Sequence, residues 1–524
     1  RVGFLLKGAK QMSLRNSGRL SRREALSALG LLAAGSTSLS PFLIGCRQSL
    51  ETPQSREKLG TRIDPLSTKP KFLVVIAAAG GASIVDGMLA VRESEAGANA
   101  IRLNAFPDAS VQSVPGSPFR AVRHSSAKIG SIPIPVNTDQ LAFVKKYADD
   151  MLVATSVGTS VNHVIAQKRS ITGNNAWKGR TLQECVALQF GQGMPVPNVN
   201  MAFGGYTERG VDDSLPAAMY AETVTNPSLW PLGLDGTRGI LGAPGKDVVD
   251  LARKARDELH TQSVFGQTFS DAVSMQRWLA QSAASSTLEA QDLITKLNVL
   301  PDMPPQIPLT QYGLATSPDG ARVRQVLPTF FDDPFAGQAA LAFLLIKYRV
   351  SSAVTIGPDF NVKLGGGTGL FNPPLAFDFS HNDHRSGQAF MWDRIMGTVD
   401  KLITLLKSEP FDTATGESLW DRTMIYVATD FGRTRNRPDS ATTFGSGHDL
   451  NNGFVLLSPM VKGNTILGGV DPLTTLTYGF DARTGAPQVG KLTPNEPDIF
   501  SGVLTAMGAD LAGSGLPDAS AFKA

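Results

Sequence analysis

Phe72-Leu-Val-Val-Ile-Ala-Ala-Ala79 is a continuous apolar run that stops at the pair Gly80-Gly81. A run of this length without polar alternation predicts a strand that is buried on both faces, as strands of parallel sheets are. The glycine pair predicts a turn at the carboxyl end of this strand, because residues without a side chain interrupt regular strand pairing. We therefore start the folded body at this strand.

Similar apolar runs recur along the chain, at 151–155, 352–356, 423–428 and 453–457. Segments with helical periodicity separate them, and the clearest are Gly337 to Val350 and Gly387 to Ser408. Strands that alternate with helices predict an α/β fold, with a mostly parallel sheet covered by helices on both faces. In such sheets ligands bind beyond the carboxyl ends of the strands.

The stretch from about 204 to 334 has a different character, because it is rich in Pro and Gly. It holds two expected helices, at 246–260 and 270–297, and we interpret it as an insertion beside the sheet. The α/β domain itself is predicted to extend over 72–512, and residues 513–524 form a C-terminal tail.

The N-terminal region has the order of a secretory signal. Arg22-Arg23 precedes a mildly apolar run from Ala25 to Ile44, and Leu43-Ile-Gly-Cys46 follows. A basic region, an apolar core and a small-residue processing site are the parts of a signal peptide, and the arginine pair indicates the twin-arginine type. We expect residues 1–46 to be the signal peptide and lipobox, with 1–11 an upstream extension, and 47–71 to be a flexible tether.

The lipobox pattern implies a diacylglyceryl thioether on Cys46, so the first expected partner is a membrane that holds this lipid. We therefore expect an exported, membrane-anchored lipoprotein of the periplasm or cell envelope. The chain is 42% apolar and 18% charged, with a formal net charge of +3 to which the signal and tether contribute strongly. A folded body that is close to neutral argues against nucleic acid as a partner.

Residues that can carry chemistry gather at the expected strand ends. The chain has only six histidines, and four of them, together with several aspartates, follow strands: His163, His381, His384, His448, Asp86, Asp378, Asp383, Asp430 and Asp449. Rigid strands can aim ligands that are far apart in sequence at one point. The pattern predicts a divalent metal site at the carboxyl edge of the sheet.

Several segments resemble the bacterial family "domain of unknown function 1501", which belongs to the alkaline-phosphatase-like superfamily. The most specific match is Thr429-Asp-Phe-Gly-Arg-Thr434 followed by Gly447-His-Asp449. Supporting matches are Gly80-Gly81 with Asp86-Gly87, Asn162-His163, Phe377-Asp378 with His381, and 497–504. Together they extend over roughly residues 72–512, and they imply the superfamily's fold.

The resemblance also implies roles for single residues. It makes Asp86, Asp378, His381, Asp430 and His448 metal ligands, with zinc, manganese or calcium as the metal and the number of ions left open. The turn Gly158-Thr-Ser-Val-Asn-His163 is similar to the nucleophile turn of cofactor-independent phosphoglycerate mutases. Ser160 is then the expected nucleophile, Thr159 the reserve, and Arg433 the residue that binds a phosphate or sulfate oxygen. The alternative for Arg433 is a structural ion pair with Asp430 or Asp449.

Two departures from the superfamily pattern limit this assignment. Phe431 stands where an active enzyme has a metal-binding His, and a phenyl ring offers no lone pair to a metal. The spacing from Asp378 to His381 is also one residue shorter than usual, which leaves Asp383 and His384 as competing ligands. His163 is expected to hydrogen-bond across the strand ends, and Ser160 could also cap the helix that follows it.

These observations support two classes of function. The leading hypothesis is a metal-dependent hydrolase-like protein that acts on a small phosphate or sulfate ester. The alternative is a non-catalytic envelope lipoprotein that uses the same fold to bind a glycan or a protein partner, and Phe431 favours this alternative.

Overall fold

The computed structural model describes the body of the chain with several gaps. The described residues are 70–124, 138–173, 176–202, 204, 209–234, 244–272, 275–276, 292–358, 376–491 and 495–524. The predicted signal peptide, Cys46 and residues 47–69 of the predicted tether lie outside them. Among the described helices, none combines the length and the apolar character that a membrane span requires.

An eight-stranded sheet forms the centre of the fold, in the order β14-β4-β13-β10-β1-β7-β5-β6. Its strands are β1 (Phe72–Ala77), β4 (Met151–Val157), β5 (Asn198–Asn200), β6 (Glu222–Thr223), β7 (Ala353–Ile356), β10 (Thr423–Ala428), β13 (Asn451–Leu457) and β14 (Thr465–Leu467). β1 lies inside the sheet between β10 and β7 and is parallel to both.

The sheet is mostly parallel, which confirms the predicted α/β fold class. β13 alone runs against its neighbours, because it is antiparallel to both β10 and β4 while the other neighbouring pairs are parallel. A parallel strand needs a crossover connection, usually a helix. Between β10 and β13 the chain forms only the two-residue strands β11 (Gly432–Arg433) and β12 (His448–Asp449), so β13 returns in the opposite direction.

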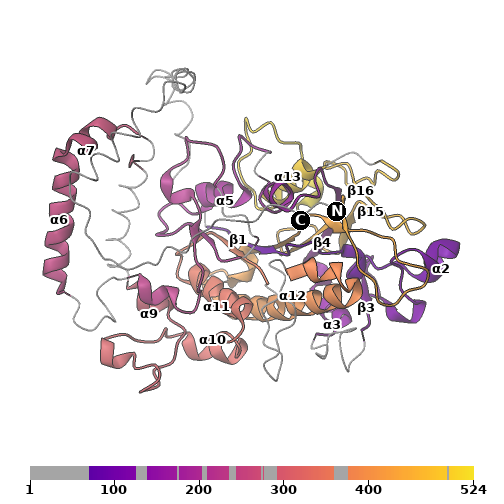
Figure 1. Cartoon of the computed structure of the whole chain (residues 1–524), viewed down its shortest axis with the longest axis horizontal. Coiled ribbons are helices and arrows are strands. Elements are labelled where there is room, and N and C mark those ends of the chain that lie inside the picture. The colour runs from indigo at the N-terminus through magenta and orange to yellow at the C-terminus, as the bar shows by residue number, and fades with distance from the viewer. Residues whose placement is uncertain are drawn as a thin grey trace, which may run out of the picture. The chain divides into compact units, whose positions relative to one another are not determined.

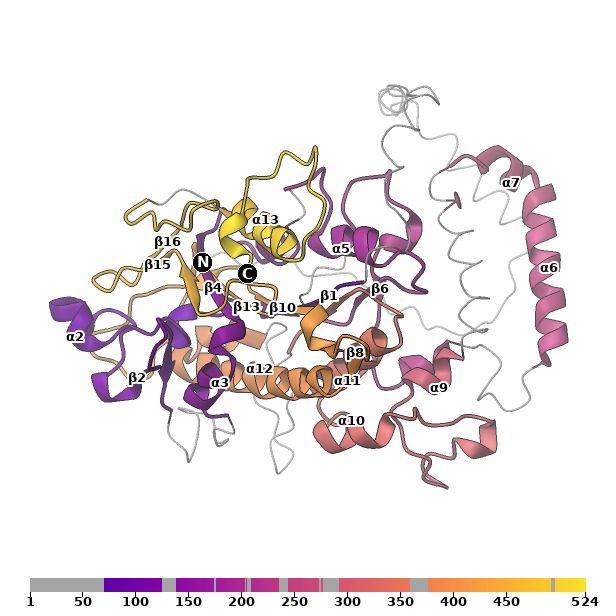
Figure 2. The same cartoon turned by 180° about the vertical axis from the view of Figure 1, so that it is seen from behind.

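Helices cover both faces of the sheet (Figures 1 and 2). On one face lie α3 (Gln140–Tyr147), α11 (Pro334–Lys347) and α12 (His384–Lys407), and on the other lie α5 (Leu182–Phe190) and α13 (Glu496–Ala506). Alternate residues of β1 belong to two separate apolar clusters, with Val74 and Ile76 on the α11–α12 side and Val75 and Ala77 on the α5–α13 side. The continuous apolar run of β1 is therefore required, because both of its faces are buried.

The long helices begin earlier than periodicity alone predicted. α11 starts at Pro334, where the Asp333 carboxylate accepts the N–H of Phe335, and α12 starts at His384, where the Asp383 carboxylate accepts the N–H of Ser386. Carboxylates at such positions satisfy N–H groups that the first turn leaves unpaired. Asp383 therefore serves as the cap of α12.

The stretch predicted as an insertion also contributes to the sheet, because β6 pairs with β5 at its edge. The expected helix at 246–260 is α6 (Lys246–Gln262), and α7 (Val264–Phe269) follows it. Much of the helix expected at 270–297 lies outside the described residues, and its last turn is α9 (Leu293–Leu297). The remaining described α-helices are α2 (Glu93–Ala96), α4 (His163–Ala166) and α10 (Gly320–Val326).

Candidate metal centre

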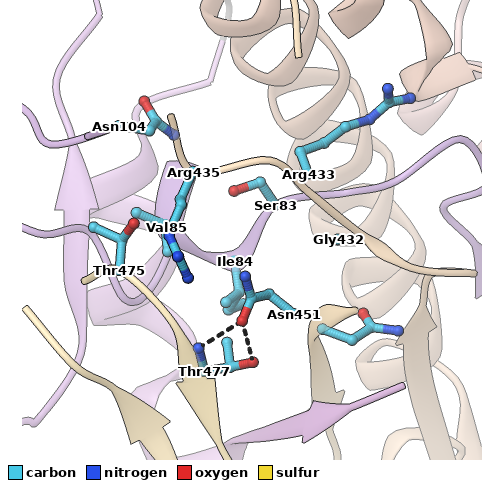
Figure 3. A pocket seen from close by; sticks show the side chains of 11 residues that line it. Ser83, Ile84, Val85, Asn104, Gly432, Arg433, Arg435, Asn451, Thr475 and Thr477 are labelled. Atoms are coloured by element: carbon cyan, nitrogen blue, oxygen red, sulfur yellow. Dashed lines mark hydrogen bonds between the residues drawn. The ribbon is translucent and has the colours of Figure 1, made fainter. Parts of the chain in front are cut away.

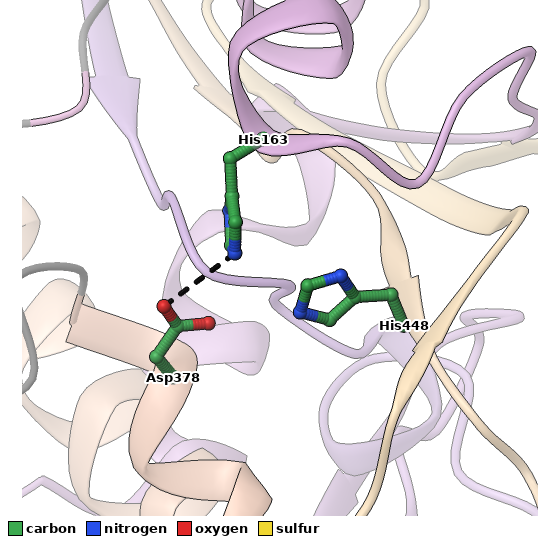
Figure 4. Close-up of side chains that lie close together, drawn as sticks. All are labelled: His163, Asp378 and His448. Atoms are coloured by element: carbon green, nitrogen blue, oxygen red, sulfur yellow. Dashed lines mark ion pairs between the residues drawn. The ribbon is translucent and has the colours of Figure 1, made fainter. Parts of the chain in front are cut away.

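Three side chains from different elements converge at the carboxyl edge of the sheet: His163, Asp378 and His448 (Figure 4). His163 opens α4 after β4, and Asp378 lies in the 3-10 helix η11 (Ala376–His381). His448 reaches the same edge because the antiparallel β13, which it precedes, starts there, with Asn451 paired to Val157. One ligand atom from each residue lies within 4.8 Å of the others, so the group can hold a metal ion.

The His163 ring is held by a buried carboxylate. Its Nδ1 lies 2.9 Å from Oδ2 of Asp430, and an ionised carboxylate only accepts, so Nδ1 donates the proton. In the neutral ring Nε2 then carries a lone pair, and it lies 3.6 Å from Oδ2 of Asp378. A carboxylate behind the histidine fixes the tautomer and orientation that metal binding needs. Asp430 therefore supports a ligand through a hydrogen bond.

His448 is oriented in a similar way. Its Nδ1 lies 2.9 Å from the carbonyl oxygen of Val161, which can only accept, so Nε2 carries the lone pair in the neutral ring. The ring stacks on Phe431, with the two centroids 4.0 Å apart and the planes 28° apart. Phe431 also contacts the His163 ring, at 4.8 Å between centroids. Phe431 therefore packs against two of the three ligands.

His381 adds a further nitrogen beside the group. Its Nε2 lies 3.0 Å from Nε2 of His448 and 3.2 Å from Nη1 of Arg433. Arginine only donates, so Nε2 of His381 uses its lone pair to accept from Arg433. The ligand atoms that converge are those of His163, Asp378 and His448, and this donor set fits a cation with one position left open. His381 lies beside the group as a neighbour of His448.

Arg433 holds Asp378 in place from behind. Its Nη2 donates to Oδ1 of Asp378 at 2.8 Å, and the guanidinium also donates to the carbonyl oxygens of Gly80, Phe377 and Ser446. The Arg433 side chain is fully buried. We expected Arg433 to bind an anionic substrate oxygen, but these contacts place it as a positioning residue for Asp378.

Gly80 and Gly81 explain how these elements approach so closely. Both have positive φ angles, 94° and 84°, and their N–H groups donate to the Asp430 carboxylate. A Cβ on Gly80 would lie 2.7 Å from the backbone nitrogen of Asp378, and one on Gly81 would lie 2.6 Å from Nε of Arg433. The glycine pair that ends the first apolar run is therefore required by both conformation and space.

The ring pKa values differ within the group. Burial lowers the pKa of His163, but the hydrogen bond and charge of Asp430 and the charge of Asp378 outweigh it, so this pKa is raised. Burial and the positive charge of Arg433 lower the pKa values of His381 and His448. Lowered values favour neutral rings, which is the form that binds metal.

Asp86 and His384 lie apart from this group and form a buried pair of their own. Oδ2 of Asp86 contacts Nε2 of His384 at 3.0 Å and Nδ2 of Asn104 at 2.9 Å, and Nδ1 of His384 contacts Oγ of Ser446 at 2.8 Å. The metal role that we expected for Asp86 does not match this placement, because its carboxylate is directed to His384. Nor does His384 compete with His381, since both of its nitrogens are occupied.

The Asp86–His384 pair predicts a loss of stability in acid. Burial raises the pKa of Asp86, but the charge and hydrogen bond of His384 outweigh it, so this pKa lies below its ordinary value. Its contribution is then present above the unfolded value of about 3.9 and is lost as the pH falls through the lower folded value. We expect the free energy of unfolding to fall less steeply below about pH 4 in Asp86→Asn than in the wild type, measured by urea denaturation. Equal slopes would contradict the pairing.

Ser160 lies on the loop between β4 and α4, two residues after Gly158 and one before Val161. Its Oγ accepts the N–H of Asn162 at 3.1 Å, while the helix cap is Asn162, whose side chain accepts from Ile165. The neighbouring Thr159 is engaged by Glu496, at 2.8 Å from Oε2. Ser160 therefore does not cap α4. The carbonyl oxygen of the next residue, Val161, contacts the ligand His448.

Sequence reasoning did not include His163 among the metal ligands. The structure gives it both the hydrogen bond across the strand ends that we expected and a free nitrogen in the group. The available signal was its position at the start of a helix shortly after the buried strand β4.

Comparisons with known proteins add little to this picture. No protein-family model matches the chain, and no curated protein matches it. The chain is similar to the crystal structure of Ps i-CgsB over 86% of this chain and 75% of that chain, at 10% sequence identity and a TM-score of 0.30. A likeness at this level carries no argument about fold or function.

Proposed function

We propose that this chain is an exported, lipid-anchored envelope protein of the alkaline-phosphatase-like superfamily that hydrolyses a small phosphate or sulfate ester with one bound divalent metal. The observation that carries the proposal is the group His163, Asp378 and His448, in which each side chain is oriented by a partner of its own. Three protein ligands with one open position are typical of catalytic metal sites, whereas structural sites are closed.

The donor set favours zinc over calcium. Calcium takes six to eight oxygen ligands, whereas His163 and His448 offer imidazole nitrogens and Asp378 alone offers oxygen. A bound metal would polarise the ester and lower the pKa of a water or hydroxyl at the site. Three residues of the protein orient the metal ligands. Asp430 fixes His163, Arg433 fixes Asp378, and Phe431 covers one side of the His448 ring.

Ser160 is the proposed nucleophile, because it lies on the loop that leads into His163 and that carries Val161, whose carbonyl oxygen contacts His448. We expect Ser160→Ala to abolish hydrolysis of p-nitrophenyl phosphate or sulfate while leaving the melting temperature and bound metal unchanged. Thr159→Ala is the matched control and should retain activity, since Thr159 is engaged by Glu496. Full activity in Ser160→Ala would exclude Ser160 as the nucleophile.

A second candidate is a non-catalytic lipoprotein that binds a glycan or a protein partner. Two features favour it: Phe431 supplies no ligand for a second metal, and the Arg433 guanidinium is turned inward onto carbonyl oxygens and Asp378. Elemental analysis of protein purified without chelators separates the two. A stoichiometric zinc or manganese ion that His448→Ala loses supports the enzyme, whereas its absence favours the binding protein.

The export and anchoring part of the proposal rests on Arg22-Arg23 and on Leu43-Ile-Gly-Cys46. We expect Arg22→Lys with Arg23→Lys to leave unprocessed protein in the cytoplasm, and Cys46→Ala to release a soluble form or to block processing. Cell fractionation with labelled palmitate measures both. Unchanged fractionation in both variants would contradict the anchor.

A further inference from the structure

A small cavity lies beside β11 (Figure 3). Its volume is about 20 Å³, which is room for roughly one water-sized group. The residues that line it come from the loop after β1, from Asn104, from β11 and the residues after it, and from the start of β13 and β16 (Thr477–Tyr478). In Figure 3 the Arg433 guanidinium points away from the cavity, so only Arg435 offers its charged end there.

Two polar groups of this cavity have no partner among the described residues. Thr475 is 3% exposed, and its Oγ1 is fully buried without a hydrogen bond. The Arg435 side chain is partly exposed and reaches in between Thr475 and Ile84 in Figure 3, and its guanidinium has no hydrogen bond or ion pair with a residue of the described ranges. A buried hydroxyl without a partner costs about 1–3 kcal/mol, so such a group in a native protein points to a missing partner.

The backbone at Thr475 is consistent with this interpretation. Its φ angle is +53°, which is uncommon for a β-branched residue. Asp471 holds this turn, because its carbonyl accepts the N–H of Thr475 at 2.7 Å. The turn thus fixes Thr475 in a costly conformation that places its hydroxyl at the cavity wall.

The charge of the cavity wall selects the kind of ligand. Its lining contains two arginines and no acidic residue, and its other members are neutral. Oδ2 of the nearest carboxylate along the chain, that of Asp86, contacts His384 and Asn104, while its Oδ1 is buried without a hydrogen bond to a described residue. A free guanidinium beside a hydroxyl donor matches an oxyanion, to which arginine donates more than one N–H.

We propose that this cavity receives one oxygen of a small oxyanion, a phosphate, sulfate or carboxylate group, with Thr475 donating its hydroxyl and Arg435 pairing with the charge. Only one oxygen fits the space, so the rest of the ligand lies at the mouth of the cavity beside Arg435. This subsite uses none of the three metal ligands and does not depend on the proposed hydrolysis.

Titration calorimetry of the full chain with sodium phosphate, sulfate and acetate, against chloride at equal ionic strength, tests the subsite. We expect saturable binding of at least one of the three oxyanions, weakened at least tenfold in Arg435→Gln and in Thr475→Val. Thr475→Val keeps the branched shape and removes only the hydroxyl, so it remains informative if the arginine variant folds poorly. The ranking of phosphate and sulfate against acetate identifies the group that the subsite takes.

Two further variants separate this subsite from general surface charge and from the metal group. Arg102→Gln is the matched control, because Arg102 is 73% exposed and pairs with Asp439, and it should bind as the wild type does. His448→Ala should lose metal but keep the anion, so a failure of the proposed hydrolysis leaves this inference standing. Binding that chloride reproduces, binding that is equal in Arg435→Gln and the wild type, or an ordered water that no oxyanion displaces would overturn it.

Discussion

The double variant His163→Ala with His448→Ala is expected to abolish stoichiometric zinc or manganese binding. It removes both imidazoles of the group and leaves Asp378 as the one remaining ligand. Loss of a partner that merely orients a ligand typically costs about 10–100-fold in metal affinity, so loss of two ligands should cost far more than 100-fold. Titration calorimetry with zinc, supported by elemental analysis, measures the loss.

Matched variants make this result specific to the site. His260→Ala, on α6, removes an imidazole elsewhere and should bind zinc as the wild type does. Asp430→Asn keeps a hydrogen-bond acceptor behind His163 but removes its charge, and an intermediate loss of about 10–100-fold is expected. If the double variant stays folded and binds zinc with unchanged affinity, the group is no metal site.

The fold could be predicted largely because one strand is buried on both faces. The strand predicted at 423–428 has the same bounds as β10. The run predicted from Phe72 to Ala79 corresponds to β1, which ends two residues earlier, at Ala77. The direction of β13 could not be predicted in the same way, because strand direction depends on the connection that precedes it. The starts of α11 and α12 depend on the caps Asp333 and Asp383, which lie outside the apolar periodicity.

The sequence predicted the location of the site in the fold better than it predicted which residues are its ligands. Asp378 and His381 are three residues apart, one residue fewer than in the superfamily pattern, but η11 is a 3-10 helix, in which residues i and i+3 lie on the same side. His384, three residues further on, is the first residue of α12 and is directed to Asp86. Whether a side chain of this segment reaches the site depends on whether the local helix is a 3-10 helix or an α-helix. The sequence of a short polar segment does not show which of the two forms.

Arg433→Met is expected to have the largest effect on stability, lowering the free energy of unfolding by about 3–5 kcal/mol. The variant keeps much of the side-chain volume but removes the charge that pairs with Asp378, which is only 13% exposed. It also leaves the carbonyl oxygens of Gly80, Phe377 and Ser446 without their donor. Urea denaturation, followed by circular dichroism, measures the change.

The comparison with an exposed arginine decides whether burial is the cause. Arg102→Met removes a pair whose side chains are 73% and 72% exposed, and it should change the free energy of unfolding by no more than about 1 kcal/mol. Arg433→Lys keeps the charge but loses the planar fork that contacts three carbonyl oxygens, so it should fall between the two. If Arg433→Met costs no more than Arg102→Met, the guanidinium does not hold Asp378, and the metal group loses the residue that orients its carboxylate.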